Sequence, residues 1–124
     1  MSDHSLSDQK VIEQLERSRD QLLSGDSASD LVRVLRRKLQ SITRNVYVLR
    51  WVPEQAEDIY DVLVDGVTVV RVEISRVTPG QETAFESWTV EEYRSNRKAL
   101  TKPERRKLEL ALELARSLRN RHEG

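Results

Sequence analysis

The feature of this sequence that most limits its fold is the pair Asp65-Gly66, which separates two apolar runs. The first run, residues 59–64, reads IYDVLV, and the second, residues 67–75, reads VTVVRVEIS. A hairpin turn of type I′ needs positive φ angles at both central residues, and Asp-Gly adopts them readily. The sequence therefore predicts an antiparallel β-hairpin.

The turn also predicts the register of this hairpin. A two-residue turn places Val62 opposite Val69 and Asp58 opposite Glu73. Side chains near the turn are then apolar on both faces, whereas a strand with one face in water alternates apolar and polar residues. We therefore expect the hairpin to be covered on both sides, or to be covered on one side and paired with a partner on the other.

A third strand is predicted before the hairpin. Residues 44–52, RNVYVLRWV, are rich in β-branched and aromatic residues, and Pro53 ends the run. Residues 76–88 contain the turn pair Pro79-Gly80 and are predicted to form a loop. Strands with short connections normally pair with their neighbours in sequence, so we expect a three-stranded antiparallel meander.

Apolar residues at helical spacing predict four helices outside the meander. These helices cover residues 8–23, 28–41, 89–99 and 101–120. The last two begin with TVEE and TKPE, in which a glutamate follows a threonine by three residues, the pattern of a capping box. The predicted fold class is α+β, with two N-terminal helices, a three-stranded antiparallel meander and two C-terminal helices (ααβββαα).

The chain has 124 residues, the size of one ordinary domain. Its first predicted helix has a narrow apolar stripe, which suits docking on the domain or on a second copy of the chain. We therefore predict that residues 1–26 form a helical arm that can detach, and that residues 27–121 form a single α+β domain.

The charges are segregated along the chain although the formal net charge is zero. Residues 31–51 carry six basic residues and no acidic one, residues 52–93 carry ten acidic residues and two basic ones, and residues 94–124 are basic again. A zero net charge gives no overall field that attracts nucleic acid or an anionic membrane. The alternation predicts surfaces of opposite sign, which either neutralise each other in the fold or serve partners.

Several chemistries are excluded or disfavoured. There is no cysteine, so disulfides and thiol catalysis are impossible. The two histidines, His4 and His122, lie near the ends of the chain, and the four glycines are isolated rather than gathered in a phosphate-binding loop. We therefore predict no catalytic residue, no cofactor and a non-enzymatic function.

The sequence also predicts a compartment. The N-terminal stretch MSDHSLSDQK lacks the basic and apolar regions of a signal peptide. No apolar run approaches the ~20 residues of a membrane span. We expect a cytoplasmic protein with no membrane partner.

The acidic residues of the hairpin suggest one catalytic alternative. Asp58 or Asp61 on one strand and Glu73 on the next resemble the paired carboxylates of PD-(D/E)xK nucleases, which hold Mg²⁺. Ser75 occupies the position of that family's lysine, so the resemblance implies at most a degenerate metal nuclease. The other interpretation is that these carboxylates lie in water at the open end of the hairpin, beside arginines.

Basic residues of the predicted helices are candidates for binding phosphates or an acidic partner. They are Arg33, Arg36, Arg37, Arg44, Arg94, Arg97, Lys98, Lys102, Arg105 and Arg106. The order of helix, three strands and helix resembles that of double-stranded-RNA-binding domains, which would imply duplex RNA as a ligand. The Lys-Lys-x-Ala-Lys signature of that family is absent, and the nearest stretch reads KPERRKLELALELA. A solvated helix face is the alternative interpretation of these charges.

Candidate protein contacts come from aromatic and apolar residues. Trp51 and Trp88 lie at element boundaries, and Leu15 and Leu22 lie on the stripe of the first helix. Aromatic residues often anchor interfaces, although each of these side chains could instead lie in the core. We predict a small binding or regulatory protein, such as an adaptor, an inhibitor or an antitoxin- or immunity-type protein. Its predicted partner is another protein or a second copy of itself, and a nucleic-acid-binding domain is the main alternative.

Overall fold

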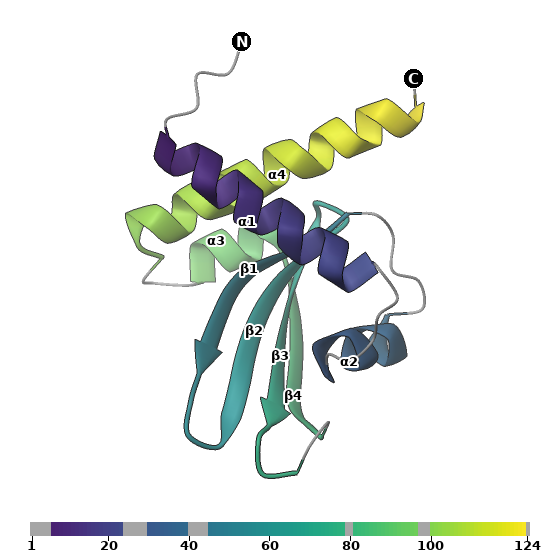
Figure 1. Ribbon diagram of the computed structural model, residues 1–124, viewed down its shortest axis with the longest axis vertical. Helices are drawn as coiled ribbons and strands as arrows, with labels where there is room; N and C mark the ends of the chain where they lie inside the picture. The colour runs from purple at the N-terminus through teal and green to yellow at the C-terminus, as the bar shows by residue number, and fades with distance from the viewer. Residues whose placement is uncertain (1–5, 24–29, 40–44, 79–80, 97–99, 124) are drawn as a thin grey trace.

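The computed structural model describes residues 6–23, 30–39, 45–78, 81–96 and 100–123 (Figure 1). In chain order its elements are α1 (Leu6–Leu23), α2 (Asp30–Lys38), β1 (Val46–Pro53), β2 (Glu57–Val64), β3 (Thr68–Ser75), β4 (Glu82–Thr89), α3 (Val90–Asn96) and α4 (Lys102–Glu123). The described strands form one antiparallel sheet in the order β1-β2-β3-β4, and the α+β class is confirmed.

The prediction of three strands is wrong, because β4 occupies residues that were predicted to form a loop. The sequence of β4, ETAFESWT, includes glutamate, alanine and serine, which are uncommon in strands. Pairing with β3 outweighs this weak local preference, with Trp88 opposite Val69 and Phe85 opposite Val72. Because β4 is an edge strand with much of its surface in water, polar residues are tolerated there.

The predicted hairpin register is also wrong, by one residue. Asp65 and Gly66 do have the expected positive φ angles of 57° and 71°. The N–H of Val67 donates to the carbonyl of Val64 at 3.2 Å, but the carbonyl of Val67 accepts the N–H of Val90 at 3.1 Å, and the ladder begins at Val64 and Thr68. Val62 therefore lies opposite Val70 rather than Val69. The shift changes the partner of every residue in the two strands.

One face of the sheet, which we call the α4 face, is covered by α1, α3 and α4. Its core includes Tyr47, Leu63 and Val69 from the strands and Leu108 and Ala111 from α4, all almost fully buried. The hairpin turn lies against the same helix, because a Cβ added to Gly66 would lie 3.1 Å from the Cβ of Ala115. Glycine at this turn is thus required by its positive φ angle and by the close approach of α4.

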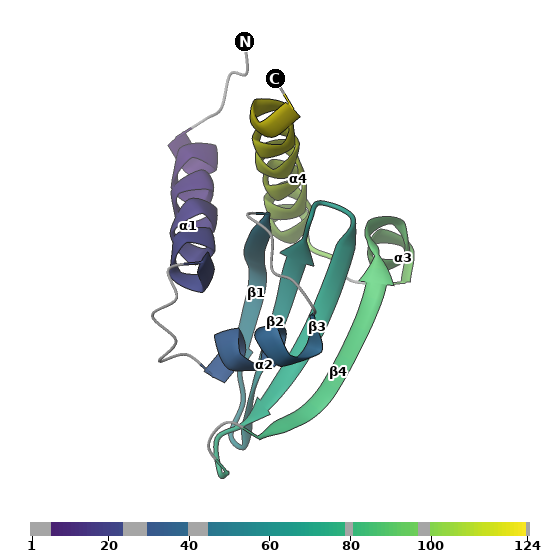
Figure 2. The same ribbon diagram turned by 90° about the vertical axis from the view of Figure 1, so that its right-hand side faces the viewer.

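The opposite face, which we call the α2 face, is covered by the short helix α2. Figure 2 shows α2 lying across the strands. Four of its nine residues, Leu31, Val32, Val34 and Leu35, are buried. They belong to the same core cluster as Val62, Val64, Val70, Val72 and Ile74. Of the two expected alternatives, cover on both sides is the one observed, in the half of the hairpin near its turn.

The first helix lies beside the edge strand β1 (Figure 2). Leu15 is fully buried in the α4-face core, and the Ser18 hydroxyl accepts the backbone N–H of Val48 at 3.1 Å. At its start, Asp8 forms two hydrogen bonds with Arg106 of α4, at 3.1 and 2.7 Å. Apolar burial and polar contacts thus both hold α1 against the rest of the fold.

Both predicted capping boxes are present. The N–H of Thr89 donates to the Glu92 carboxylate at 2.9 Å, and the N–H of Glu92 donates to the Thr89 hydroxyl at 3.1 Å. Thr101 and Glu104 make the same reciprocal pair at 2.9 and 3.2 Å. These contacts satisfy backbone N–H groups that a helix leaves unpaired in its first turn.

One end of the sheet projects beyond all four helices, as Figures 1 and 2 both show. This end, which we call the open end, carries the β1–β2 and β3–β4 connections. No helix in the described part of the chain combines the length and apolar character that a membrane crossing requires.

Candidate functional site

The open end carries an exposed tryptophan on the α2 face. Trp51 lies opposite Tyr60 across the β1–β2 ladder, so both side chains leave the sheet on the same side. Their rings are stacked, with centroids 6.4 Å apart and planes inclined by 11°. Trp51 is nevertheless 57% exposed, whereas Tyr60 is partly buried.

Asp58 fixes the orientation of this tryptophan. The indole N–H of Trp51 donates to an Asp58 carboxylate oxygen at 3.0 Å, and two guanidinium nitrogens of Arg76 donate to the same oxygen at 3.1 and 2.7 Å. The hydrogen bonds from Arg76 lower the pKa of Asp58, so the carboxylate is ionised near neutral pH. A ring stack and a hydrogen bond therefore hold one exposed side chain in a single orientation.

Further apolar groups are exposed at this end. Val77, next to Arg76 in the chain, is 79% exposed, and Pro53 and Ala56 are exposed in and after β1. The N–H of Arg76 donates to the carbonyl of Ala56 at 2.7 Å, which links the two connections. The open end thus presents an aromatic side chain and an arginine, residue types that often anchor interfaces, beside small apolar groups.

On the α4 face, the open end is acidic. Glu73 lies opposite Ala84 on β4 and Ile59 on β2, and all three are partly buried. Burial and the neighbouring carboxylates of Glu57 and Glu86 raise the pKa of Glu73. The two faces of the open end therefore differ. The α2 face carries aromatic rings and an ion pair, whereas the α4 face carries an excess of negative charge.

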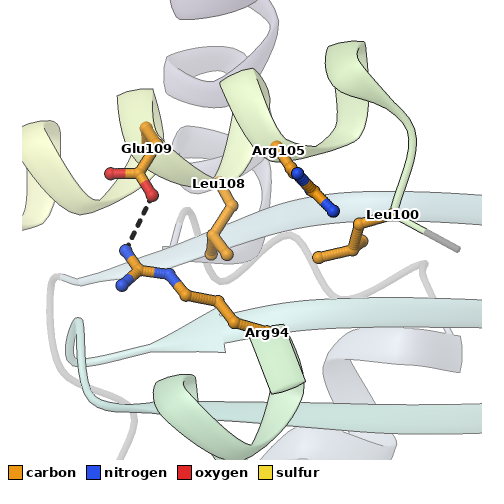
Figure 3. Close-up of a pocket in the computed structure, with 5 residues that line it drawn as sticks. All are labelled: Arg94, Leu100, Arg105, Leu108 and Glu109. Carbon is orange, nitrogen blue, oxygen red and sulfur yellow. Dashed lines mark hydrogen bonds and ion pairs between the residues drawn. The ribbon is translucent and has the colours of Figure 1, made fainter. Parts of the chain in front are cut away.

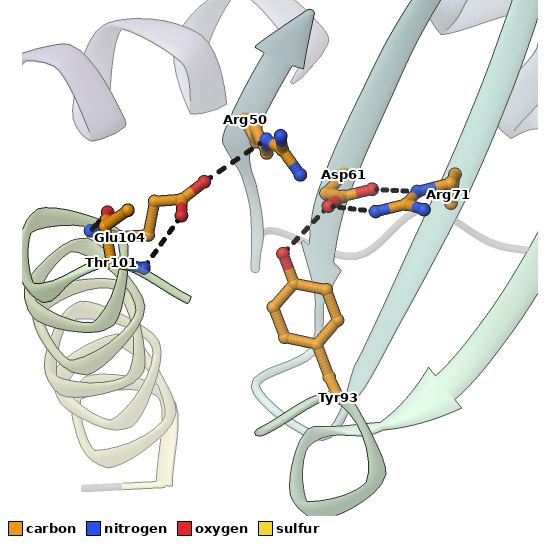
Figure 4. A network of polar contacts seen from close by, with 6 residues as sticks. All are labelled: Arg50, Asp61, Arg71, Tyr93, Thr101 and Glu104. Atoms are coloured by element: carbon orange, nitrogen blue, oxygen red, sulfur yellow. Dashed lines mark hydrogen bonds and ion pairs between the residues drawn. The ribbon is translucent and has the colours of Figure 1, made fainter. Parts of the chain in front are cut away.

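A buried polar network separates the open end from the helix-covered end (Figure 4). Asp61 is only 1% exposed and lies opposite Arg71, whose guanidinium donates to both carboxylate oxygens at 2.8 and 3.0 Å. The hydroxyl of Tyr93 in α3 also donates to Asp61, at 2.8 Å. Burial raises the pKa of Tyr93 far above its usual value, so this hydroxyl remains a donor. The network attaches α3 to the sheet.

A second contact attaches α4 to the same region. The Arg50 guanidinium lies 3.2 Å from the Glu104 carboxylate, which also closes the capping box with Thr101 (Figure 4). Arg50 reaches α4 because the β1–β2 ladder is irregular between Val48 and Arg50. This β-bulge places Arg50 opposite Asp61, on the α4 face.

A shallow pocket of about 230 Å³ lies between α3 and α4 (Figure 3). Leu100 and Leu108 form its apolar part, and Arg94, Arg105 and Glu109 form its polar part. Arg94 is bonded to Glu109 at 2.7 Å. The pocket is small and its charges are partly compensated, so it offers little to a large ligand.

The predicted basic residues are distributed over several surfaces. Arg33 pairs with Asp30, and Arg37 pairs with Glu82 on the α2 side of the sheet. Arg36 is exposed on α2, and Lys102 is exposed at the first residue of α4. Arg94 and Arg105 border the pocket on the α4 side, and Arg106 faces α1. Arg44, Arg97 and Lys98 lie outside the described residues. Those that are described do not form one continuous basic face.

The other predicted contact residues have different environments. Leu15 is in the core, and Trp88 is partly buried beside Tyr93, with ring centroids 6.1 Å apart, and beneath the Arg71 guanidinium. The Leu22 side chain is not among those described. Of the four predicted protein contacts, Trp51 therefore has the largest described exposure.

No metal site was predicted, and the structure does not bring together the three carboxylates of the nuclease alternative. Asp61 and Glu73 leave the sheet on the α4 face, whereas Asp58 leaves it on the α2 face. Asp58 and Asp61 are each bonded to an arginine. Within the described ranges, no three histidine, aspartate or glutamate side chains form a group that could hold a metal ion.

Comparisons with known proteins identify no relative. No family model matches the chain, and neither the curated proteins nor the solved structures contain a significant match. Function must therefore be argued from the site itself.

Sequence reasoning missed two residues that hold Trp51 at the open end. Tyr60 and Arg76 support Trp51, but neither was predicted to be a site residue. The pairing of Trp51 with Tyr60 could have been found by aligning the two strands across the connection that follows Pro53. Asp58 does lie beside an arginine, as the alternative interpretation of the hairpin carboxylates expected, but its hydrogen bond with Trp51 was not predicted.

Proposed function

We propose that this protein is a non-enzymatic protein-binding module whose docking site is the open end of the sheet, centred on Trp51. The observation that carries the proposal is that Trp51 is 57% exposed and yet is fixed by the Tyr60 stack and the Asp58 hydrogen bond. A partner that covers this indole gains apolar burial, and little side-chain freedom is lost because the ring is already oriented.

The expected partner surface has an apolar pocket for the indole. The Asp58–Arg76 pair beside Trp51 compensates its own charge, so the partner needs no strong charge at that point. The acidic α4 face of the open end would favour basic groups around the pocket. An adaptor or an inhibitor of a basic protein fits this surface.

A protein partner is favoured over nucleic acid by the distribution of charge. Phosphate binding normally uses several cations on one surface. Here Arg37 and Arg94 lie on opposite sides of the sheet, and Arg106 is paired with Asp8 of α1. The basic residues are therefore better explained as separate local contacts than as one phosphate-binding face.

The test compares capture of partners by three versions of the tagged chain: wild type, Trp51→Ala and Val67→Ala. Val67 is a matched control, since it is 54% exposed and lies at the opposite end of the β2–β3 hairpin. We expect proteins captured by wild type and by Val67→Ala to be lost with Trp51→Ala. Equal capture by all three would contradict the proposal.

An identified partner allows a quantitative version of this test. Removing an interface hot spot costs at least about 2 kcal/mol, which corresponds to a roughly 30-fold higher Kd. Isothermal titration calorimetry should show this increase in Kd for Trp51→Ala and a much smaller increase for Trp51→Phe, which keeps an aromatic ring. The Val67→Ala chain should bind like wild type.

A further inference from the structure

The two edges of the sheet are protected to different degrees. Beside β1 lies α1, whose Ser18 hydroxyl accepts the N–H of Val48 at 3.1 Å. The bulge near Arg50 interrupts the ladder, and Pro53 has no N–H to offer. Covering elements, bulges and proline are the devices that prevent edge strands from pairing with other chains.

The other edge, β4, is less protected, since its one irregularity is a bulge near its start, where Glu73 lies opposite Ala84 and Ile74 lies opposite Glu82. Its eight residues, Glu82–Thr89, contain no proline and no lysine, and no described element pairs with its outer side. The N–H of Val90 points inward to Val67, whereas the N–H of Thr89 donates to the Glu92 side chain. Because peptide groups alternate in direction along an antiparallel strand, those of Phe85 and Ser87 also point outward.

We propose that the outer edge of β4 receives an extended segment of a partner protein that carries acidic side chains and pairs as a fifth strand. Addition of a strand to an exposed sheet edge is a common mode of peptide recognition, in which main-chain hydrogen bonds supply affinity. This site is distinct from Trp51, which lies on β1 at the opposite edge, so the inference goes beyond the proposed function.

The last turn of α2 supplies the preference for acidic side chains. Arg37 and Lys38 lie 3.3 and 3.4 Å from the Glu82 carboxylate, and the Lys38 ammonium lies 5.6 Å from the centre of the Phe85 ring. Two cations therefore meet one carboxylate at the start of β4. A fifth strand that passes this point would place the side chains of its α2 face beside an excess of positive charge, whereas those of its α4 face would lie near Glu86.

A second copy of this chain fits the edge less well. In an antiparallel β4–β4 pair that uses most of the eight residues, Glu82 of one copy lies opposite Trp88 or Thr89 of the other. Neither residue carries a charge. Self-pairing therefore leaves the positive excess at α2 without a carboxylate from the other copy.

The test uses two labelled synthetic octapeptides, one alternating threonine with glutamate and one alternating threonine with lysine. Fluorescence anisotropy at near-physiological salt should show about tenfold tighter binding of the glutamate peptide. Amide hydrogen exchange, followed by NMR, should slow at Phe85 and Ser87 when that peptide is present. Trp51→Ala should leave this binding unchanged.

Two variants with a matched control separate the backbone and charge contributions. Ser87→Pro removes an outward N–H, a change that an edge strand tolerates, and should abolish binding, whereas Ser87→Ala should not. The double variant Arg37→Glu/Lys38→Glu should remove the preference for the glutamate peptide. Circular dichroism should show that each variant retains the fold.

Three outcomes would overturn the inference. The first is equal affinity for the two peptides. The second is that, without peptide, the amides of Phe85 and Ser87 exchange as slowly as the amide of the buried Val70. The third is a dimer in sedimentation experiments whose formation protects the Phe85 and Ser87 amides, which would make a second copy the occupant.

Discussion

Similar residues have different roles at the covered end and at the open end of the sheet. Strand β2 carries Asp61 where helices cover the sheet and Asp58 three residues away at the open end. Asp61 is 1% exposed and bonds Arg71 and Tyr93, whereas Asp58 orients the exposed Trp51. The comparison suggests that polar contacts at the covered end stabilise the fold, and that those at the open end pre-organise a surface.

The largest expected effect is at the covered end, where Leu15 holds α1 in the core. Leu15→Ala should reduce the free energy of unfolding by about 3 kcal/mol, because it removes a fully buried side chain and leaves a cavity. Urea denaturation would measure the change, with Leu6→Ala as a control, since Leu6 is 84% exposed on the same helix.

The same variant tests whether residues 1–26 form an arm that detaches. If α1 and the domain unfold together, Leu15→Ala should accelerate amide exchange throughout the sheet. Faster exchange confined to α1, with an unchanged denaturation midpoint for the sheet, would instead show that the arm opens by itself.

Asp61→Ala should have the next largest effect. It leaves the Arg71 guanidinium without its bidentate partner and the Tyr93 hydroxyl without its acceptor. Removing one partner of a fully buried ion pair costs about 3–5 kcal/mol, and the partial exposure of Arg71 lowers our expectation to about 2 kcal/mol. Thermal and urea denaturation would measure the loss.

Asp58→Ala is the matched control for this substitution. Its partner Arg76 is exposed, so its loss should cost less than about 1 kcal/mol. If the two alanine variants were equally destabilised, the distinction between the two ends would fail.

Much of the fold could be predicted because its signals are local. Capping boxes at Thr89 and Thr101 and the Asp65-Gly66 turn each depend on residues within one short stretch. The observed register is accompanied by a hydrogen bond between Val67 and Val90, which are far apart in sequence. β4 was missed because its pairing with β3, rather than its own residues, makes it a strand.

The candidate site was predictable only in part. Trp51 was identified as a possible contact from its aromatic character, and its exposure supports that choice. The one-residue register error paired Asp58 with Glu73 and hid the Asp61–Arg71 pair. The basic residues were grouped by sequence, but folding places Arg37 and Arg94 on opposite sides of the sheet.

The two tryptophans offer a smaller and more direct contrast. Trp51→Ala should change stability by about 1 kcal/mol or less, since the loss is mainly that of the stack with Tyr60. Trp88→Ala should cost about 2 kcal/mol, because Trp88 is partly buried beside Tyr93 and Arg71. Denaturation of both variants, read by circular dichroism, would show whether the open end contributes less to stability. A larger loss of stability for Trp51→Ala than for Trp88→Ala would contradict the conclusion that the covered end contributes more to stability than the open end.

The smallest expected effect has the opposite sign and depends on pH. Burial and the Glu57 carboxylate raise the pKa of Glu73 in the folded state, so the folded protein holds this proton more tightly than the unfolded chain does. Stability then falls as the pH rises from the ordinary glutamate pKa through the raised one. Glu73→Gln removes this loss and should stabilise the protein at pH 7 by about 0.5 kcal/mol, the scale of a cross-strand charge pair. The gain should disappear below about pH 4, where the wild-type carboxyl is protonated in both states.

Denaturation at pH 7 and below pH 4 would measure this gain in stability, with Glu13→Gln on the exposed side of α1 as the control. A stabilisation that is equal at both pH values would show that repulsion at the open end is not its cause.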